Sequence, residues 1–198
     1  MNRRKFVKNS LLSSAAVATA GSAFANDRRI QQNETTNDTF QLQYAPHLGM
    51  FRHSAGDDPI DQLKFMADQG FMAFEDNGML KRDVRLQEKM AAQMAKTNMQ
   101  MGVFVVDGGD NWKTSLTTGK QEFIDNFVNT CKKSVDVAKR VNATWMTVVP
   151  GFYDRSKPLD MQTANVIEAL RRGAEIFEPH GLVMVLEPLN FRDHPGLF

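Results

Sequence analysis

The feature that most constrains the fold is a regular alternation of short apolar segments with longer amphipathic ones. The segments between the apolar runs carry an apolar residue every three or four positions, which is typical of helices that bury one face. The apolar runs are continuous rather than alternating, which indicates parallel strands covered by helices. The runs span residues 40–44, 71–74, 101–106, 145–149 and 183–186. The chain is therefore predicted to be an α/β protein built from βα units.

Start and stop signals delimit the first three predicted helices. Asp58 is an N-cap residue followed by Pro59 at the first helical position, and Gly70 ends this helix. The next two helices are predicted over residues 84–98 and 121–141, because their apolar residues fall on one face. On the third helix that face carries Phe123, Phe127, Cys131, Val135 and Ala138.

The fourth helix is predicted to begin at Asp160, as its cap, and to end before Gly181. The face expected to point to the core carries Ala164, Ile167, Leu170, Ala174 and Phe177. Together with the strands, this makes five strands and four helices in strict alternation.

Two architectures fit this alternation: an open doubly wound sheet, and a (β/α)8 TIM barrel of which the chain holds part. Residues 45–49, after the first strand, do not form a Gly-rich phosphate-binding loop of the kind found in many doubly wound folds. No helix follows the fifth strand before residue 198, and a complete barrel needs about 250 residues. These observations favour a partial TIM barrel with about five strands and four helices of the N-terminal half.

The N-terminal region has the parts of a twin-arginine signal peptide in the expected order. Residues 1–25 contain the Arg3-Arg4 pair, a weakly apolar run and a small-x-small cleavage site. Residues 26–38 are polar and aperiodic, which is typical of a flexible spacer. We expect export to the periplasm by the twin-arginine pathway, with the barrel domain spanning residues 39–198.

Composition excludes some functions. With 24 Lys and Arg against 23 Asp and Glu, the formal net charge is +1, which argues against a nucleic acid partner. No apolar run approaches the roughly 20 residues of a membrane helix, so no membrane association is expected after signal cleavage. Cys131 is the only cysteine, so no intrachain disulfide can form.

Polar residues follow each predicted strand, and the ends of parallel strands meet at one rim. His47 follows the first strand and Glu75 the second, although each could also have a purely structural role. Asp107 and Asp110 follow the third strand and are interpreted as turn residues, and Trp112 nearby is a candidate pocket wall. A divalent cation or an enolising carbonyl substrate would need such converging carboxylates and imidazoles.

Glu187 is the strongest candidate for chemistry. It follows four apolar residues of the fifth strand, and burying a carboxylate there is costly unless it is paired or bound to a metal. The structural alternative is an ion pair with Arg192.

Residues 187–196 read Glu-Pro-Leu-Asn-Phe-Arg-Asp-His-Pro-Gly, which resembles the E-P-[IL]-N-x-R-D-x-P-G segment of hydroxypyruvate isomerases. These enzymes belong to the xylose isomerase-like barrel superfamily of sugar isomerases and epimerases. Residues 70–75 are similar to that superfamily's G-[FY]-x-x-[FV]-E, and the order of βα units matches over residues 40–198.

The resemblance implies a metal-dependent isomerase or epimerase that moves a proton through an enediol of a small hydroxy-carbonyl or sugar substrate. It implies that Glu187 binds a divalent cation (Mg, Mn, Zn or Co) and takes part in proton transfer. It places His47, Glu75, Asn190 and Arg192 at the substrate. The further metal ligands of the family lie on strands six to eight, so we expect the 198-residue chain alone to be metal-poor and inactive.

Two other functions are weighed against this one. An exported barrel that binds a sugar without catalysis would lack the second glutamate of the family on strand eight. An endonuclease IV-like DNA repair enzyme would need many histidines and a basic groove, whereas this chain has four histidines. The open strand edges of a partial barrel also favour association with another copy, so a homo-oligomer is expected.

Overall fold

The computed structural model describes residues 40, 42–187 and 189–198. The signal peptide predicted for residues 1–25 and the spacer predicted for residues 26–38 lie outside this part of the chain. In chain order the elements are α2 (Arg52–Ala55), α3 (Pro59–Asp68), β1 (Ala73–Phe74), the 3-10 turn η1 (Met79–Lys81), α4 (Val84–Thr97), β2 (Gln100–Met101), β3 (Val103–Val105), η2 (Leu116–Thr118), α5 (Gln121–Val141), β4 (Trp145–Val148), α6 (Leu159–Phe177), η3 (Glu178–His180) and β5 (Val183–Leu186). None of the helices in the described residues is long and apolar enough to cross a membrane.

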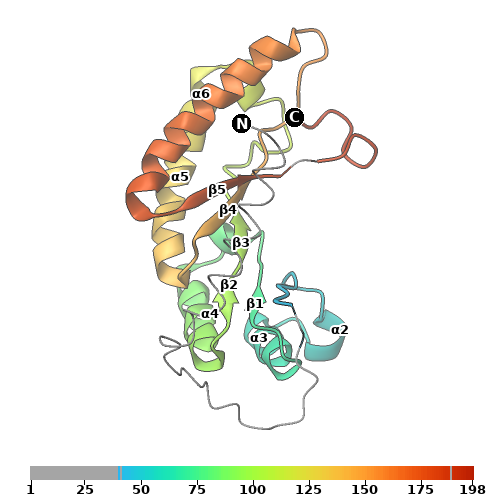
Figure 1. Cartoon of the computed structure of the whole chain (residues 1–198), viewed down its shortest axis with the longest axis vertical. Helices are drawn as coiled ribbons and strands as arrows, with labels where there is room; N and C mark the ends of the chain where they lie inside the picture. The colour runs from blue at the N-terminus through green and yellow to red at the C-terminus, as the bar shows by residue number, and fades with distance from the viewer. Residues whose placement is uncertain (1–39, 41, 188) are drawn as a thin grey trace, which may run out of the picture. The chain divides into compact units, whose positions relative to one another are not determined.

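The strands are parallel, and their order in space follows their order in the chain (Figure 1). β1 pairs with β2, and β3, β4 and β5 pair in sequence. The Gly102 N–H donates to the Phe74 carbonyl at 2.7 Å, and the Asp76 N–H donates to the Val103 carbonyl at 3.1 Å. These two bonds join the pairs into one continuous ladder. A doubly wound sheet reverses its strand order at a switch point, so this unreversed order identifies the fold as a partial TIM barrel.

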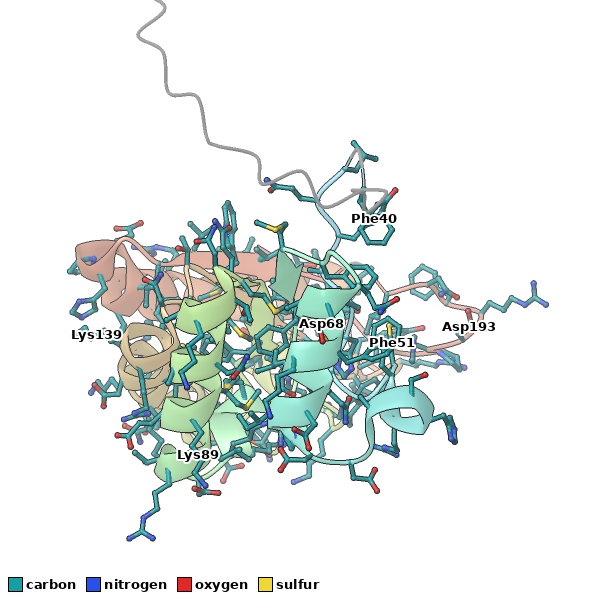
Figure 2. The ribbon with its side chains drawn as sticks, turned by 90° about the horizontal axis from the view of Figure 1, so that it is seen from below. Phe40, Phe51, Asp68, Lys89, Lys139 and Asp193 are labelled. Atoms are coloured by element: carbon teal, nitrogen blue, oxygen red, sulfur yellow. The ribbon has the colours of Figure 1, made fainter. Side chains whose placement is uncertain are left out.

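The long helices form a row in which each packs on the next. Figure 2 shows three of them together, with Asp68 at the end of α3, Lys89 on α4 and Lys139 on α5. Right-handed crossovers between strands that advance in one direction place every helix on the same face of the sheet. The described part of the chain therefore has one helix-covered face and one opposite, inner face.

Side-chain burial separates the two faces. Phe74, Phe104 and Met146 are fully buried, and they lie on the covered face together with Met101 and Val148. On the inner face the side chains paired across the ladder are far more accessible: Trp145 is 49% exposed, Val183 38% and Val185 36%. Exposed apolar side chains on a free strand edge make β5 a surface open to association.

The first predicted strand is largely absent from the structure. A single bridge between His47 and Glu75 replaces it, with the Glu75 N–H donating to the Pro46 carbonyl at 3.0 Å. Phe40, which was predicted to lie in this strand, instead stacks on Phe71 with ring centroids 4.7 Å apart. Proline has no N–H for a ladder, which contributes to the shortness of this pairing.

The third predicted strand is divided at Gly102. A Cβ atom at this position would lie 3.0 Å from the Phe74 carbonyl oxygen, so the close approach of the two backbones requires glycine. The other strand predictions are confirmed within two residues of their ends.

Most of the predicted helix signals are confirmed. The Asp58 side chain caps α3 by accepting from the Ile60 N–H at 2.7 Å, and Gly70 follows that helix at φ +89°. The predicted inner face of α5 is correct, since Phe127, Cys131, Val135 and Ala138 are buried and Phe123 packs against them. Burial raises the pKa of the Cys131 thiol to about 12, so the residue behaves as a small apolar side chain.

The predicted face of the fourth helix is only partly correct: Phe177 is buried and Leu170 packs against the core, but two other positions do neither. Ala164 and Ile167 are exposed in α6, whereas the buried side chains are Gln162, Val166, Ala169, Gly173 and Phe177. The helix also begins at Leu159 after Pro158, and the Asp160 carboxylate accepts only from the next N–H. The prediction fails at these positions because a buried glutamine and a glycine occupy core positions that an apolar pattern does not reveal.

Gly173 allows α6 to approach α5 and β5. A Cβ atom there would lie 2.7 Å from Met184 Cε and 2.8 Å from Phe127 Cε1. The methionine tip can move aside, but the packed phenylalanine ring has little room. We expect Gly173→Ala to lower the free energy of unfolding by about 1–2 kcal/mol, as overpacked cores do.

Urea denaturation followed by circular dichroism measures this change. Ala164→Leu adds bulk at an exposed position of the same helix and should stay within about 0.5 kcal/mol of the unmodified chain. Alanine has a higher helix propensity than glycine, so Gly173→Ala would stabilise the chain if the added methyl group met no clash. A stabilised variant would therefore show that the α5–α6 packing is looser than described.

Candidate functional site

A cleft of ≈ 480 Å³ lies at the carboxyl ends of the strands. Its walls come from the segments that follow β1, β3, β4 and β5, which is where parallel α/β folds place their chemistry. It is lined by Asn77, Gly78, Lys81, Val105, Asp107, Asn111, Trp112, Val149, Glu187, Leu189 and His194.

Glu187 reaches this cleft because it continues the alternation of β5. Its N–H donates to the Val148 carbonyl at 3.3 Å, which extends the ladder by one residue past the strand. Val183, Val185 and Glu187 therefore lie on the inner face. The glutamate is exposed and forms no ion pair within the described residues, with Arg192 or any other. Glu187 was predicted to be buried at a desolvation cost. In the described residues no element covers the inner face at β5, so the carboxylate remains in contact with solvent.

Asp107 and Lys81 form the charged wall of the cleft. Lys81 Nζ lies 2.5 Å from Asp107 Oδ2, and the Gly109 N–H donates to Asp107 Oδ1 at 2.7 Å. Burial raises the pKa of Asp107, but the hydrogen bonds from Lys81 and Gly109 and the charge of Lys81 together outweigh burial and lower it below its ordinary value. Asp107 is therefore held as a carboxylate, and its ion pair with Lys81 joins the turn in which it lies to η1.

The loop that precedes this wall is fixed by a buried ion pair. The Asp76 carboxylate is nearly inaccessible and receives two bonds from Arg82, with Nε at 2.5 Å and Nη2 at 3.1 Å. Gln87 donates to the Arg82 carbonyl at 3.0 Å and accepts a hydrogen bond from Arg140. This chain of bonds links β1 to α4 and α5, so Asn77 and Lys81 project from a rigid segment.

Trp112 and His194 bring two distant segments together across the cleft. Their ring centroids lie 5.6 Å apart with the planes tilted by 50°. Trp112 belongs to the long loop after β3, and His194 belongs to residues 189–198, which we call the tail. The indole is 58% exposed, so it presents an open apolar wall on which a flat ligand could rest.

The loops after β3 and β4 cross at Gly151. A Cβ atom on Gly151 would lie 2.4 Å from Ser115 Oγ and 2.5 Å from the Lys113 carbonyl oxygen, and the residue has φ +97°. Both facts require glycine. The Phe152 N–H donates to the Lys113 carbonyl at 2.7 Å, which joins the two loops at this crossing.

The tail is attached to the same place. The Phe198 N–H donates to the Gly151 carbonyl and the Tyr153 N–H to the Gly196 carbonyl, both at 2.9 Å. Asn190 Oδ1 accepts from the N–H groups of Arg192 and Asp193 at 3.0 and 2.9 Å, which forms a local turn.

Of the five residues predicted for catalysis, metal binding or substrate contact, the structure brings one into the cleft, where Trp112 forms the predicted pocket wall. Glu187 lines the cleft, whereas His47 and Glu75 lie side by side at the far edge of the sheet, with His47 Nδ1 2.7 Å from the Leu48 carbonyl oxygen. Asn190 uses its side-chain oxygen in the tail turn, and Arg192 is exposed beside it. The substrate roles predicted for these four residues remain predictions.

Sequence reasoning missed several of the residues that line the cleft. Lys81 and Asn111 carried no motif, because their proximity to Asp107 and Trp112 follows only from the folded loops. Asp107 was interpreted as a turn residue, which is correct, but its carboxylate also faces the cleft. His194 lies directly before the Pro195-Gly196 pair of the segment 187–196, and this position is the available signal for it.

The described residues do not by themselves fit a metal ion. No group of three or more His, Cys, Asp or Glu side chains in the part of the chain that the structure describes is arranged to hold one. Divalent cations need several such ligands. Glu187 could contribute a single carboxylate, so a metal site would need ligands from other segments.

The fold and the sequence together establish the class of protein. Residues 63–197, more than half of the chain, match the xylose isomerase-like TIM barrel family. The chain belongs to this family. No curated protein sequence gives a significant match.

Solved structures with the same fold have low sequence identity. An AP endonuclease of family 2 from Brucella melitensis superposes with a TM-score of 0.65 at 20% identity, covering 79% of this chain and 58% of that one. A 3-keto-D-glucoside 4-epimerase from E. coli gives 0.61 at 16% identity, with coverage of 79% and 58%. A D-psicose 3-epimerase from Clostridium cellulolyticum H10, solved with D-tagatose, gives 0.61 at 13%, with coverage of 76% and 53%. The chain thus spans a little over half the length of these structures.

The Lys81–Asp107 pair makes a pH-dependent contribution to stability. Lys81→Met removes the hydrogen bond and the charge that lower the Asp107 pKa. A carboxylate whose folded pKa is lowered stabilises the protein above its unfolded pKa, and this stabilisation is lost as pH falls through the folded pKa. Because Lys81 is largely exposed, we expect the variant to lose about 0.5–1 kcal/mol at pH 7.

The difference between Lys81→Met and the unmodified chain should shrink as pH falls below the ordinary pKa of an aspartate, and it should vanish once Asp107 is protonated in the folded chain. Urea denaturation at a series of pH values measures it. Lys89→Met, at an exposed position of α4, is the matched control and should show no such pH dependence. A constant difference at all pH values would contradict the assigned origin of the Asp107 pKa.

Proposed function

We propose that the complete barrel containing this chain is an isomerase or epimerase of a small hydroxy-carbonyl or sugar substrate. The observation that carries this proposal is the position of Glu187, on the inner face at the end of β5 and inside the cleft at the carboxyl ends of the strands. Membership of the xylose isomerase-like family supports it, and so does the likeness in fold to solved sugar epimerases.

The residues of the cleft fit the requirements of such a reaction. Isomerisation of a hydroxy-carbonyl compound requires a base that removes a proton beside the carbonyl and returns it elsewhere. The Glu187 carboxylate is accessible from the cleft, so its oxygens can accept and return that proton. Lys81 and Asn111 can donate hydrogen bonds to substrate oxygens, and the indole of Trp112 can cover the apolar side of the substrate.

The finer assignment is hydroxypyruvate isomerase-like, and it rests on residues 187–196 alone. It includes a divalent cation that would polarise the substrate carbonyl, with Glu187 as one of its ligands. The remaining ligands would come from strands that follow this half of the barrel. His47, Glu75, Asn190 and Arg192 are proposed to contact the substrate in the complete barrel.

Export through the twin-arginine pathway completes the proposal. The order of parts in residues 1–25 supports it, and this pathway accepts folded proteins. A periplasmic location would make a sugar or a sugar-derived compound as good a candidate substrate as hydroxypyruvate. Fractionation of cells that produce the protein with and without Arg3 and Arg4 would show whether export depends on this pair.

A sugar-binding barrel without catalysis is the second candidate. A solved neighbour of this fold contains D-tagatose, which supports a sugar-binding site whether or not the barrel is catalytic. A DNA repair function has weaker support, because the chain carries almost balanced charge and has four histidines. The likeness to the AP endonuclease, like those to the epimerases, shows the fold alone.

The test uses Glu187→Gln in the protein made from the complete reading frame. We expect the turnover of a ketose or hydroxy-aldehyde substrate to fall about a thousandfold, as it does when a general base is lost. Incorporation of solvent deuterium next to the carbonyl should fall in parallel. Glu175→Gln, at an exposed position of α6, is the matched control and should keep full turnover.

Two results would overturn the proposal. Unchanged turnover in Glu187→Gln would show that the glutamate does no chemistry. Saturable sugar binding without turnover in the unmodified protein would favour the binding barrel. The 198-residue chain alone should lack turnover and bound metal, since it holds only Glu187 of the expected ligand set.

A further inference from the structure

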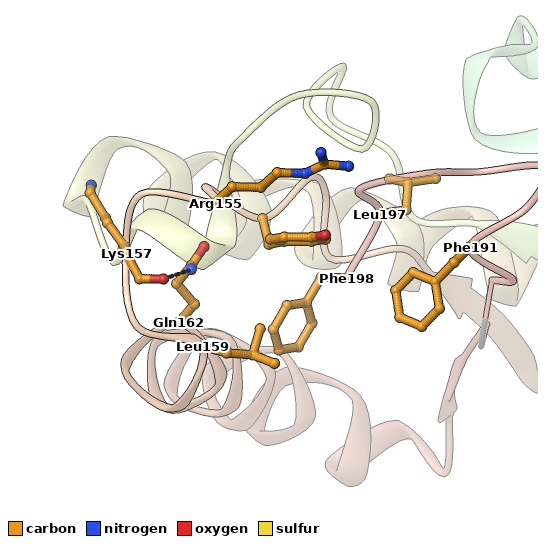
Figure 3. A pocket seen from close by; sticks show the side chains of 8 residues that line it. Arg155, Lys157, Leu159, Gln162, Phe191, Leu197 and Phe198 are labelled. Carbon is orange, nitrogen blue, oxygen red and sulfur yellow. Dashed lines mark hydrogen bonds between the residues drawn. The ribbon is translucent and has the colours of Figure 1, made fainter.

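A second pocket lies beside the cleft, on the other side of the tail. Its volume is ≈ 520 Å³, within the range of pockets that hold small molecules. Figure 3 shows the side chains that line it. They are Tyr153, Arg155, Lys157, Leu159, Gln162, Phe191, Leu197 and Phe198.

The tail divides the pocket from the cleft. Leu189 and His194 line the Glu187 cleft, whereas Phe191, Leu197 and Phe198 line the second pocket. The two spaces therefore share a wall but have different linings: the cleft has charged and amide groups, and the second pocket has mostly apolar ones. None of the residues to which the proposed reaction assigns a role lines the second pocket.

The pocket is built into the loop after β4. Gln162 is 1% exposed, and both ends of its amide are occupied by backbone groups of this loop. Its Oε1 accepts from the Asp154 N–H at 2.7 Å, and its Nε2 donates to the carbonyls of Asp154 and Lys157 at 3.0 and 3.1 Å. The segment that carries Arg155 and Lys157 is thus held in one conformation.

The opposite wall is held by backbone bonds. Leu197 pairs with Phe152 in an antiparallel bridge, and the Thr117 hydroxyl donates to the Phe152 carbonyl at 2.7 Å. Two large apolar side chains remain accessible within this rigid frame: Phe191 is 73% exposed and Leu159 is 59% exposed. A ligand that covered them would be stabilised by the hydrophobic effect.

The charge at the pocket is positive. Among the described residues Arg155 forms no ion pair. Lys157 Nζ lies 3.7 Å from Asp154 Oδ2 and points away from the aromatic rings (Figure 3), and Asp154 also accepts from the Ser156 hydroxyl at 2.6 Å. No acidic side chain lines the pocket. Three aromatic rings, those of Tyr153, Phe191 and Phe198, favour a flat apolar body, and the guanidinium of Arg155 favours a carboxylate or another planar anion.

We propose that this pocket binds a small anion with a flat apolar body, of the class of aromatic carboxylates. The apolar part would lie against Phe191, Phe198 and Leu159, and the anionic group would face Arg155, with Lys157 adding positive charge nearby. This binding is independent of the reaction proposed above.

Titration calorimetry of the 198-residue chain with 2-naphthoate tests the proposal, with 2-naphthylmethanol as the uncharged analogue. We expect saturable binding of naphthoate at one site per chain. The double variant Arg155→Ala/Lys157→Ala should weaken naphthoate at least about fivefold and the alcohol less than about twofold. Phe191→Ala should weaken both compounds at least about fivefold.

Two controls separate this pocket from other surfaces. Arg85→Ala/Lys89→Ala removes two exposed cations from α4 and should leave binding of naphthoate unchanged. Val185→Thr alters the open inner face of β5 and should also leave it unchanged, and circular dichroism verifies that each variant is folded.

Several outcomes would overturn the proposal. The first is the absence of saturable binding of naphthoate up to about 1 mM. The second is an equal loss of affinity for naphthoate and for the alcohol in the Arg155→Ala/Lys157→Ala variant. The third is a loss of affinity in Val185→Thr as large as that in Phe191→Ala. The last result would place the compound on the open face of the sheet.

Discussion

The structure depends on the burial of one face of its parallel ladder against a row of helices. Phe74, Phe104 and Met146 are completely inaccessible at the centre of this layer, and α5 supplies the longest strip of partners, which includes Phe127 and Cys131. Hydrophobic burial of this kind is the dominant favourable term in folding. Because each βα unit adds to the same layer in the same direction, the layer also fixes the strand order and brings all the strand ends to one rim.

The rim becomes a site because its loops are tied to one another. Gly151 permits the loops after β3 and β4 to cross in direct backbone contact, and the tail adds a third segment to the same point through its bonds to Gly151 and Tyr153. The Asp76–Arg82 ion pair holds the remaining loop. The Glu187 cleft and the aromatic pocket lie on opposite sides of the tail, so both take their shape from this arrangement.

Much of the fold could be predicted from the sequence because its signals are local. The Asp58-Pro59 cap, the apolar face of α5 and the continuous apolar strands each depend on residues within a few positions of one another. Predictions failed where distant groups decided the outcome. Gln162 is buried because its amide binds the loop before α6, and Gly102 breaks a strand because a neighbouring backbone comes within reach. Neither contact has a signature in an apolar pattern.

The candidate site shows the same division. The sequence by itself determined that the chain has parallel βα units and that a carboxylate, Glu187, follows the last strand, because strand patterns and strand ends are properties of short segments. Only the tertiary structure decided between a doubly wound sheet and a barrel, since strand order is set by how successive units pack. It also decided that Lys81, Asp107, Trp112 and His194 surround Glu187 while His47 and Glu75 lie at the far edge. These side chains come from four separate segments, and their proximity depends on loop crossings that no single segment encodes.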